Sequence, residues 1–343
     1  MKLFWTILSY VFVAFIASVV GSLITRHFFS NVSSQPELIK KIIERPLDKY
    51  SFDSLINTGV TKGEIKMGEV IKEYDDYTSY LFTHEFDPTL INSVNKKVTG
   101  QINIPKGNGP FPIILQFRGY VDQSIYQTGV GTRRSGEMYA KAGFITVAPD
   151  FLGYGESDTN ALSVLEGRFQ AYTTGLSVLA AIDSLPQWDK KNIFLWGHSN
   201  GGLIALTVLE ITGLPIPTTL WAPVSKPFPY SVLYYTDESL DKGKFLRKQI
   251  SDFESLYEAE KYSFENYLDR IKAPLQIHQG TGDDAVPLAW SNLLVSNLRK
   301  VKLSEEEMLS VEYHTYPGGD HNLTPGWDTV VERNIEFFKK NLK

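Results

Sequence analysis

The strongest constraint on the fold is the alternation of short apolar runs with amphipathic stretches between residues 112 and 341. The apolar runs have the length of buried strands and occupy residues 112–117, 144–148, 192–196, 219–221, 275–278 and 311–316. Helical patterns lie between or after them, at residues 135–142, 169–185, 201–211 and 330–341. Strands that alternate with helices in this way predict an α/β fold, with a mostly parallel central sheet and helices on both faces.

Three further regions surround or interrupt this alternation. Strand-like runs at residues 77–83 and 97–104 come before it. Residues 225–270 interrupt it with aromatic and charged side chains in helical patterns. We expect residues 75–343 to form one domain, with residues 28–74 as an N-terminal extension. The interruption is expected to be a small helical cap inserted after a core strand.

The first segment of the chain has the composition of a membrane helix. Residues 3–25 contain no charged side chain and consist mainly of Leu, Ile, Val, Phe and Ala. About 20 apolar residues suffice to cross a bilayer as a helix, whereas the apolar part of a cleaved signal peptide is usually only about 7–15 residues long. Residues 1–27 are therefore expected to hold one retained transmembrane helix. Lys2 and Arg26 flank it on opposite sides, so charge does not fix its orientation. Because only two residues precede the apolar run, we expect the catalytic domain outside the cytoplasm.

Composition excludes several classes of function. The 34 basic and 39 acidic residues are dispersed, which leaves no basic stripe for a nucleic acid. No glycine-rich phosphate-binding motif opens a helix. The chain has no cysteine, so disulfides, thiolate metal sites and a cysteine nucleophile are excluded. No metal or organic cofactor is expected.

A candidate nucleophile lies between a predicted strand and a predicted helix. Residues 197–201 read Gly-His-Ser-Asn-Gly and fit the G-x-S-x-G pattern. In that pattern a sharp turn lifts the serine oxygen clear of the sheet, and the glycines leave room for neighbouring backbone. The alternative is a glycine-rich turn without chemistry. The strand–turn–helix setting favours Ser199 as the nucleophile.

The general base should follow the nucleophile and its acid in the chain. His321 lies in a loop between the last predicted strand and the last predicted helix, where it is free to reach the serine. The five other histidines flank the apolar segment, precede the core, belong to the serine turn or lie within strand patterns; they are His27, His84, His198, His278 and His314. We therefore predict His321 as the base.

The acid that orients the base is expected after the strand that precedes His321. Asp283 and Asp284 both stand there, and spacing alone does not separate them. Asp150 also ends a strand, but it precedes the serine and is interpreted as a loop-capping residue.

Donors for the developing oxyanion are expected from two backbone positions. The N–H of Asn200 directly follows the nucleophile. The loop after the strand at residues 112–117 should supply the second donor, most plausibly the Tyr120 N–H. A plain turn is the alternative for this loop.

These motifs together resemble the catalytic domain of the prolyl oligopeptidase family, within the α/β-hydrolase fold. The resemblance extends from about residue 77 to the end of the chain. Its signals are the run Gly-Pro-Phe-Pro-Ile-Ile-Leu that ends at Leu115, the run Pro-Asp-Phe-Leu-Gly-Tyr-Gly-Glu-Ser at 149–157, and the double glycine at 201–202. The acid loop Asp-Asp-Ala-Val-Pro at 283–287 also resembles the family's, in which the first Asp is the catalytic one. The resemblance therefore implies Asp283.

Two residues depart from the family pattern. Arg118 stands where the family usually has His, and Leu152 occupies a position that is often Arg. Both departures concern the handling of substrate more than the nucleophile or base. The region before the domain is also too short for the β-propeller that gates the larger peptidases of the family.

The expected reaction is hydrolysis of a peptide, amide or ester bond through an acyl-enzyme on Ser199. Peptidase activity is implied by the resemblance, and a carboxylesterase or lipase-like esterase is the main alternative. A non-catalytic, membrane-tethered binding module is the third reading. The expected partners are a small peptide or ester substrate and a lipid bilayer. Four aromatic residues of the cap could line a substrate pocket or simply pack against the core: Phe228, Tyr230, Tyr234 and Tyr235.

Overall fold

A computed structural model describes residues 44–343 apart from residues 61 and 92. The chain divides into two units, residues 1–45 and residues 46–343, and only the second is described below. The predicted membrane helix at residues 3–25 lies outside the described residues. Among the residues that are described, no helix is both long and apolar enough to cross a membrane.

The described residues form a nine-stranded sheet in the order β1-β2-β3-β5-β4-β6-β7-β8-β9. The first three strands and the β3–β5 contact are antiparallel, and all the other neighbours are parallel. The strands are β1 (Ile65–Glu73), β2 (Tyr77–Phe86), β3 (Lys96–Pro105), β4 (Phe111–Phe117), β5 (Ile145–Pro149), β6 (Trp188–His198), β7 (Thr218–Trp221), β8 (Leu275–Gly280) and β9 (Val311–Tyr316). This confirms the mostly parallel sheet.

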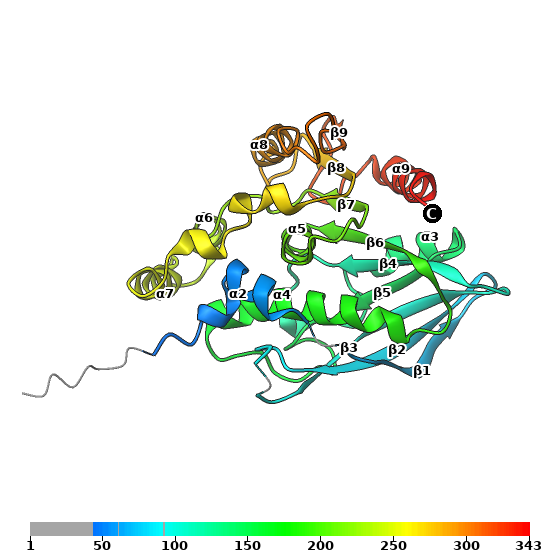
Figure 1. The fold of residues 1–343 in the computed structure, drawn as a ribbon, viewed down its shortest axis with the longest axis horizontal. Coiled ribbons are helices and arrows are strands. Elements are labelled where there is room, and N and C mark those ends of the chain that lie inside the picture. The colour runs from blue at the N-terminus through cyan, green and yellow to red at the C-terminus, as the bar shows by residue number, and fades with distance from the viewer. Residues whose placement is uncertain (1–43, 61, 92) are drawn as a thin grey trace, which may run out of the picture. The chain divides into compact units, whose positions relative to one another are not determined.

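Helices cover both faces of the sheet because neighbouring residues of the central strands point in opposite directions. On β4, Ile113 and Leu115 pack in the larger core cluster with residues of α4 and α5. Ile114 between them belongs to a second cluster with residues of α3 and α9. Figure 1 shows the arrangement of the main helices, which are α3 (Arg133–Lys141), α4 (Val164–Ala181), α5 (Asn200–Thr212), α8 (Leu288–Leu298) and α9 (Trp327–Lys340).

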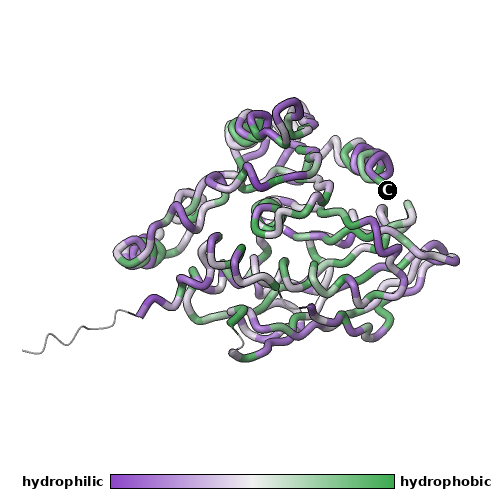
Figure 2. Tube along the Cα trace, in the orientation of Figure 1, coloured by the Kyte–Doolittle hydropathy of each residue, from purple (hydrophilic) through white to green (hydrophobic). Residues whose placement is uncertain are grey.

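Hydropathy follows this layering. In Figure 2 the hydrophobic segments gather along the central strands and α5, whereas α7 is more hydrophilic.

β1 is the strand that the sequence patterns did not predict. Only its first residue, Ile65, is buried, because the rest of this edge strand faces solvent. A strand with one buried residue carries no alternation from which it could be recognised.

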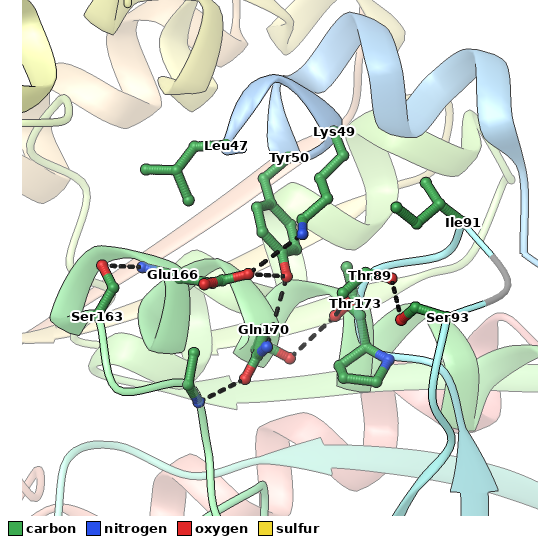
Figure 3. A network of polar contacts seen from close by, with 12 residues as sticks. Leu47, Lys49, Tyr50, Thr89, Ile91, Ser93, Ser163, Glu166, Gln170 and Thr173 are labelled. Atoms are coloured by element: carbon green, nitrogen blue, oxygen red, sulfur yellow. Dashed lines mark hydrogen bonds and ion pairs between the residues drawn. The ribbon is translucent and has the colours of Figure 1, made fainter. Parts of the chain in front are cut away.

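The segment before β1 belongs to the same compact unit, which begins at Pro46. It contains η1 (Asp48–Tyr50) and α2 (Phe52–Thr58). Tyr50 is buried, and its hydroxyl donates to Glu166 Oε1 on α4 at 3.0 Å; Lys49 Nζ lies 3.3 Å from the same oxygen (Figure 3). Gln170 Nε2 donates to the Tyr50 hydroxyl at 3.4 Å. Residues 46–73 are therefore part of the domain rather than an extension that ends at residue 74.

The interruption between β7 and β8 forms a set of short helices. They are α6 (Tyr230–Leu233), η4 (Thr236–Glu238), α7 (Lys244–Glu254), η5 (Ala259–Tyr262), η6 (Phe264–Asn266) and η7 (Leu268–Arg270). Aromatic rings join this region to α4: the Phe169 ring lies 5.7 Å from that of Phe228 and 5.2 Å from that of Tyr262. The predicted helical insertion at residues 225–270 matches this region.

Replacing Leu55 with Ala tests whether α2 is part of the core. Leu55 is fully buried in the larger core cluster, and removing a buried leucine side chain costs about 2–5 kcal/mol. We expect Leu55→Ala to lower the free energy of unfolding in urea by that amount. Asn57→Ala, an exposed change on the same helix, should alter it by less than about 0.5 kcal/mol. Equal stability of the two variants would contradict this packing.

Candidate active site

Ser199 occupies the sharp turn between β6 and α5. Its φ of 55° and ψ of −121° lie in a region that side-chain-bearing residues rarely adopt. Hydrogen bonds fix this conformation: the Ser199 N–H donates to Trp221 O at 2.9 Å, and its carbonyl accepts from Gly202 N at 2.9 Å and Val224 N at 3.0 Å. The side chain is 9% exposed. The turn thus presents one restrained hydroxyl at the carboxyl end of the sheet.

The glycines around this turn are required by close backbone contacts. A Cβ atom on Gly201 would lie 1.9 Å from Phe117 O, and one on Gly197 would lie 2.5 Å from Gly201 O. No side chain fits at such distances. The pattern G-x-S-x-G is therefore explained here by the packing of β6, α5 and the end of β4.

Asp283 and His321 meet on the loops that follow β8 and β9. His321 Nδ1 donates to Asp283 Oδ2 at 2.9 Å and lies 3.1 Å from Oδ1. Asp283 Oδ1 also accepts from Ala285 N at 2.9 Å and Val286 N at 2.8 Å, and Gln279 Nε2 donates to Oδ2 at 2.9 Å. Asp284 is exposed. The structure therefore pairs Asp283, rather than Asp284, with His321.

These contacts set the charge of Asp283. Its side chain is completely buried, and burial by itself raises the pKa of the carboxyl. The hydrogen bonds from His321 and Val286 N outweigh burial and hold the pKa of Asp283 below its usual value. A carboxylate that stays ionised orients the imidazole and stabilises its protonated form.

His198, which precedes the predicted nucleophile, contacts the loop between β9 and α9 that carries His321 (residues 317–326, the base loop). His198 Nε2 lies 2.9 Å from His321 O, and the two imidazole rings have centroids 4.8 Å apart. Burial, followed by the charge of His321, lowers the pKa of His198 to about 4. His198 is therefore neutral at pH 7. Because a carbonyl can only accept, the hydrogen sits on Nε2. Ser199 and His321 make no direct hydrogen bond within the described residues, and such bonds often tighten only when substrate binds.

The expected oxyanion loop touches the nucleophile. A Cβ atom on Gly119 would lie 2.9 Å from Ser199 Cβ and 3.5 Å from Ser199 Oγ. The next residue, Tyr120, has its side chain 77% exposed. Within the described chain, the N–H groups of Tyr120 and Asn200 donate to no protein acceptor. Asn200 is also the first residue of α5, where the helix dipole favours negative charge.

Arg118 supports this loop, a role that the sequence analysis missed. Its guanidinium donates to Gly119 O and to Asp150 O, each at 2.9 Å. The same group lies over the rings of Tyr126 and Tyr154, 4.4 Å and 4.0 Å from their centroids. Of these two rings only that of Tyr126 is near Arg118 in sequence, so the sequence carried little signal of this stacking.

Asp150 is buried beneath the same loop, as its interpretation as a loop-capping residue requires. Its carboxylate accepts hydrogen bonds from three hydroxyls: Thr99 at 2.6 Å, Tyr126 at 2.7 Å and Thr128 at 2.9 Å. Burial outweighs these hydrogen bonds and raises the pKa of Asp150. Together, Arg118 and Asp150 tie the oxyanion loop to β3 and to the end of β5.

The four aromatic residues of the cap differ in their burial and in their contacts. Phe228 is buried and packs on Phe253, with ring centroids 5.3 Å apart, so it serves the core. The Tyr235 hydroxyl donates to Ala285 O at 3.0 Å and so contacts the acid loop. Tyr230, the first residue of α6, and Tyr234, directly after this helix, are exposed and remain candidates for substrate contact. No cluster of three or more His, Asp or Glu side chains suited to a metal ion occurs in the described part of the chain.

Comparison with known proteins finds one matching family profile and a related esterase. A profile of the prolyl oligopeptidase family matches residues 132–343, a range that contains Ser199, Asp283 and His321. An acetyl esterase of Xylanibacter ruminicola is 25% identical over 290 residues, which cover 77% of this chain and 62% of that protein. The chain thus spans less than two thirds of the length of that relative.

Solved structures show the same fold. An acetyl xylan esterase of Thermoanaerobacterium is 16% identical, covers 85% of this chain and 94% of its own, and has a TM-score of 0.60. An acetyl xylan esterase of Paenibacillus is 18% identical, covers 83% and 91% respectively, and has a TM-score of 0.62. The α/β-hydrolase fold expected from the sequence is confirmed by these likenesses.

Gly119→Ala tests the contact between the oxyanion loop and the nucleophile. The added methyl group would press on Ser199 Cβ and displace the loop that carries the Tyr120 N–H. Since losing one oxyanion donor can cost roughly 100-fold in rate, we expect phosphonylation by a fluorophosphonate to slow by at least about tenfold. Gly167→Ala on α4, where the nearest obstacle is the end of the Asn160 side chain, should react normally. Equal rates in both variants would contradict the contact.

Acid titration of stability tests the state of His198. Its pKa is about 4 in the folded chain and about 6.5 unfolded, so between these values only the unfolded chain takes up this proton. Stability from this group is therefore lost as the pH falls from 6.5 to 4, by up to about 3 kcal/mol. We expect denaturant unfolding to show that wild type loses more stability over this range than His198→Gln does. Parallel pH profiles would contradict a neutral His198.

Proposed function

The chain belongs to the prolyl oligopeptidase family, and we propose that it is a carboxylic ester hydrolase that removes acetyl or similarly small acyl groups from a carbohydrate. The observation that carries the chemistry is the hydrogen bond between half-buried His321 and the buried side chain of Asp283, beside the strained Ser199 turn. The ester preference is supported by the acetyl esterase relative and by the fold shared with two acetyl xylan esterases.

The proposed reaction uses each group in turn. Ser199 Oγ attacks the acyl carbonyl while His321 takes its proton. The Tyr120 and Asn200 N–H groups stabilise the resulting oxyanion. As the tetrahedral intermediate collapses, the proton on His321 passes to the sugar oxygen, and the alcohol leaves. Water then attacks the acyl-enzyme with His321 again as base, which releases the carboxylic acid and free Ser199.

Peptide hydrolysis, the activity favoured by the sequence resemblance, is the second candidate because the family is named for peptidases. The larger peptidases of the family use a propeller domain as a gate. Here the residues that precede the family match form α2 and β1–β4 of the same domain, apart from residues outside the described chain. Membrane attachment through residues 3–25 remains a prediction from sequence.

Paired substrates test the proposal. We expect kcat/KM for p-nitrophenyl acetate and for acetylated xylo-oligosaccharides to exceed that for peptide p-nitroanilides by at least about 100-fold. Ser199→Ala should lower ester hydrolysis by roughly 10⁴-fold or more. Ser251→Ala, an exposed serine on α7, should behave as wild type. Faster cleavage of peptides than of esters would establish the peptidase reading instead, and an active Ser199→Ala would refute the assigned nucleophile.

A further inference from the structure

His198 is a titratable side chain that the proposed reaction leaves unused, although it touches the base. It is the variable residue between the first glycine and the serine of the G-x-S-x-G pattern. Its Nε2–H donates to the backbone carbonyl of His321 across 123 positions of sequence, at 2.9 Å. The two rings are tilted by 37° with centroids 4.8 Å apart. One side chain of the nucleophile turn therefore holds the backbone of the base.

The other hydrogen bonds of the base loop close the turn around His321 but, among the described residues, none of them reaches its backbone N–H or carbonyl. The loop begins against the acid loop, where Gly282 N donates to Gly319 O at 2.9 Å. It then closes a turn in which Asp320 Oδ1 accepts from Asn322 N at 2.9 Å and Thr324 N at 2.8 Å. Leu323 anchors the far side by complete burial. Among the described residues, only His198 bonds the His321 carbonyl.

A cavity of about 460 Å³ lies beside this contact. Its walls come from the start of α3 with the preceding loop, the ends of β6 and β7, and the base loop; His198, Asn322 and Thr324 are among its lining residues. Because this space is open, packing does not support the base loop from that side. On that side, the His198 hydrogen bond is the contact that reaches the His321 carbonyl.

Burial, more than the surrounding charges, keeps His198 a neutral donor: the charge of His321 also lowers its pKa, whereas Asp283 and Asp320 raise it. Asp283, Asp320 and His321 act on it from the acid and base loops. Arg133, Arg134 and Glu137 face the cavity from α3. Burial keeps the imidazole uncharged at neutral pH, so it adds no repulsion when His321 becomes protonated during catalysis. A Lys or Arg at this position could donate the same bond but would oppose that charge.

We propose that His198 is a positioning residue for the base: its Nε2–H fixes the His321 carbonyl and so keeps the imidazole aligned between Asp283 and the Ser199 hydroxyl. This inference rests on the proposed serine chemistry. A displacement of about 1 Å in a catalytic group can cost about 100-fold in rate. Because the bond lies on the backbone side of His321, its loss should affect the chemical steps rather than substrate binding.

Two near-isosteric variants separate the hydrogen bond from the shape of the side chain. His198→Gln keeps an N–H near the position of Nε2, and His198→Leu fills similar space without a donor. With p-nitrophenyl acetate we expect His198→Leu to lower kcat by about 10- to 100-fold with KM within about twofold of wild type. His198→Gln should stay within about threefold in both parameters. Glu137→Gln, which changes a residue that lines the same cavity from α3, should match wild type.

A third variant covers the case in which His198→Leu does not fold. His198→Ala enlarges the existing cavity, so added imidazole should enter it and restore part of kcat, measured after subtracting the hydrolysis of p-nitrophenyl acetate by imidazole alone and absent in wild type. A folded His198→Leu with wild-type kcat, an equal loss in His198→Gln and His198→Leu, or the absence of imidazole rescue in His198→Ala would overturn the inference. An active Ser199→Ala in the same series would instead refute the proposed function, so the two failures are distinguishable.

Discussion

The constrained turn at Ser199 is the feature on which the rest of the site depends. A positive φ at a residue with a side chain costs about 1–3 kcal/mol of conformational free energy. Favourable contacts with the surrounding structure must offset this cost. The hydrogen bonds to Trp221, Gly202 and Val224 do so, and they exist only when β6, β7 and α5 are already packed. The chemistry is therefore coupled to the centre of the sheet, while the acid and base loops follow β8 and β9 and need only reach inward from its edge.

The sequence was sufficient for the features that depend on local pattern. Buried strands such as β4 and β5 are continuous apolar runs, and the serine turn has its own glycine spacing. Features without such a pattern were missed. β1 has a single buried residue. α8 was not predicted because Leu288–Leu298 is apolar on most of its surface and shows little amphipathic periodicity. Spacing also left Asp283 and Asp284 open, and only the contact with His321 separates them in the structure.

Polar contacts between residues distant in sequence account for the parts of the site that no local sequence pattern indicates. Arg118 reaches Asp150 O, and His198 reaches His321 O, so each catalytic loop is supported by a side chain that does not react. In the sequence Arg118 was only a departure from the family pattern. In the structure its guanidinium lies against the rings of Tyr126 and Tyr154 and donates to Gly119 O in the loop that carries the Tyr120 N–H. Buried polar groups satisfied in this way hold a site to one geometry, which is what acyl transfer requires.

A crystal structure of the chain after reaction with a phosphonate ester inhibitor tests the central claim most directly, because the phosphonyl group imitates the tetrahedral intermediate. The assigned site predicts continuous density from Ser199 Oγ to phosphorus. It also predicts that the phosphoryl oxygen lies within about 3.1 Å of both the Tyr120 and Asn200 nitrogens, with His321 Nδ1 still on Asp283. An unmodified Ser199 with the inhibitor on another residue would contradict the assigned nucleophile, and a phosphoryl oxygen directed away from both N–H groups would contradict the oxyanion site.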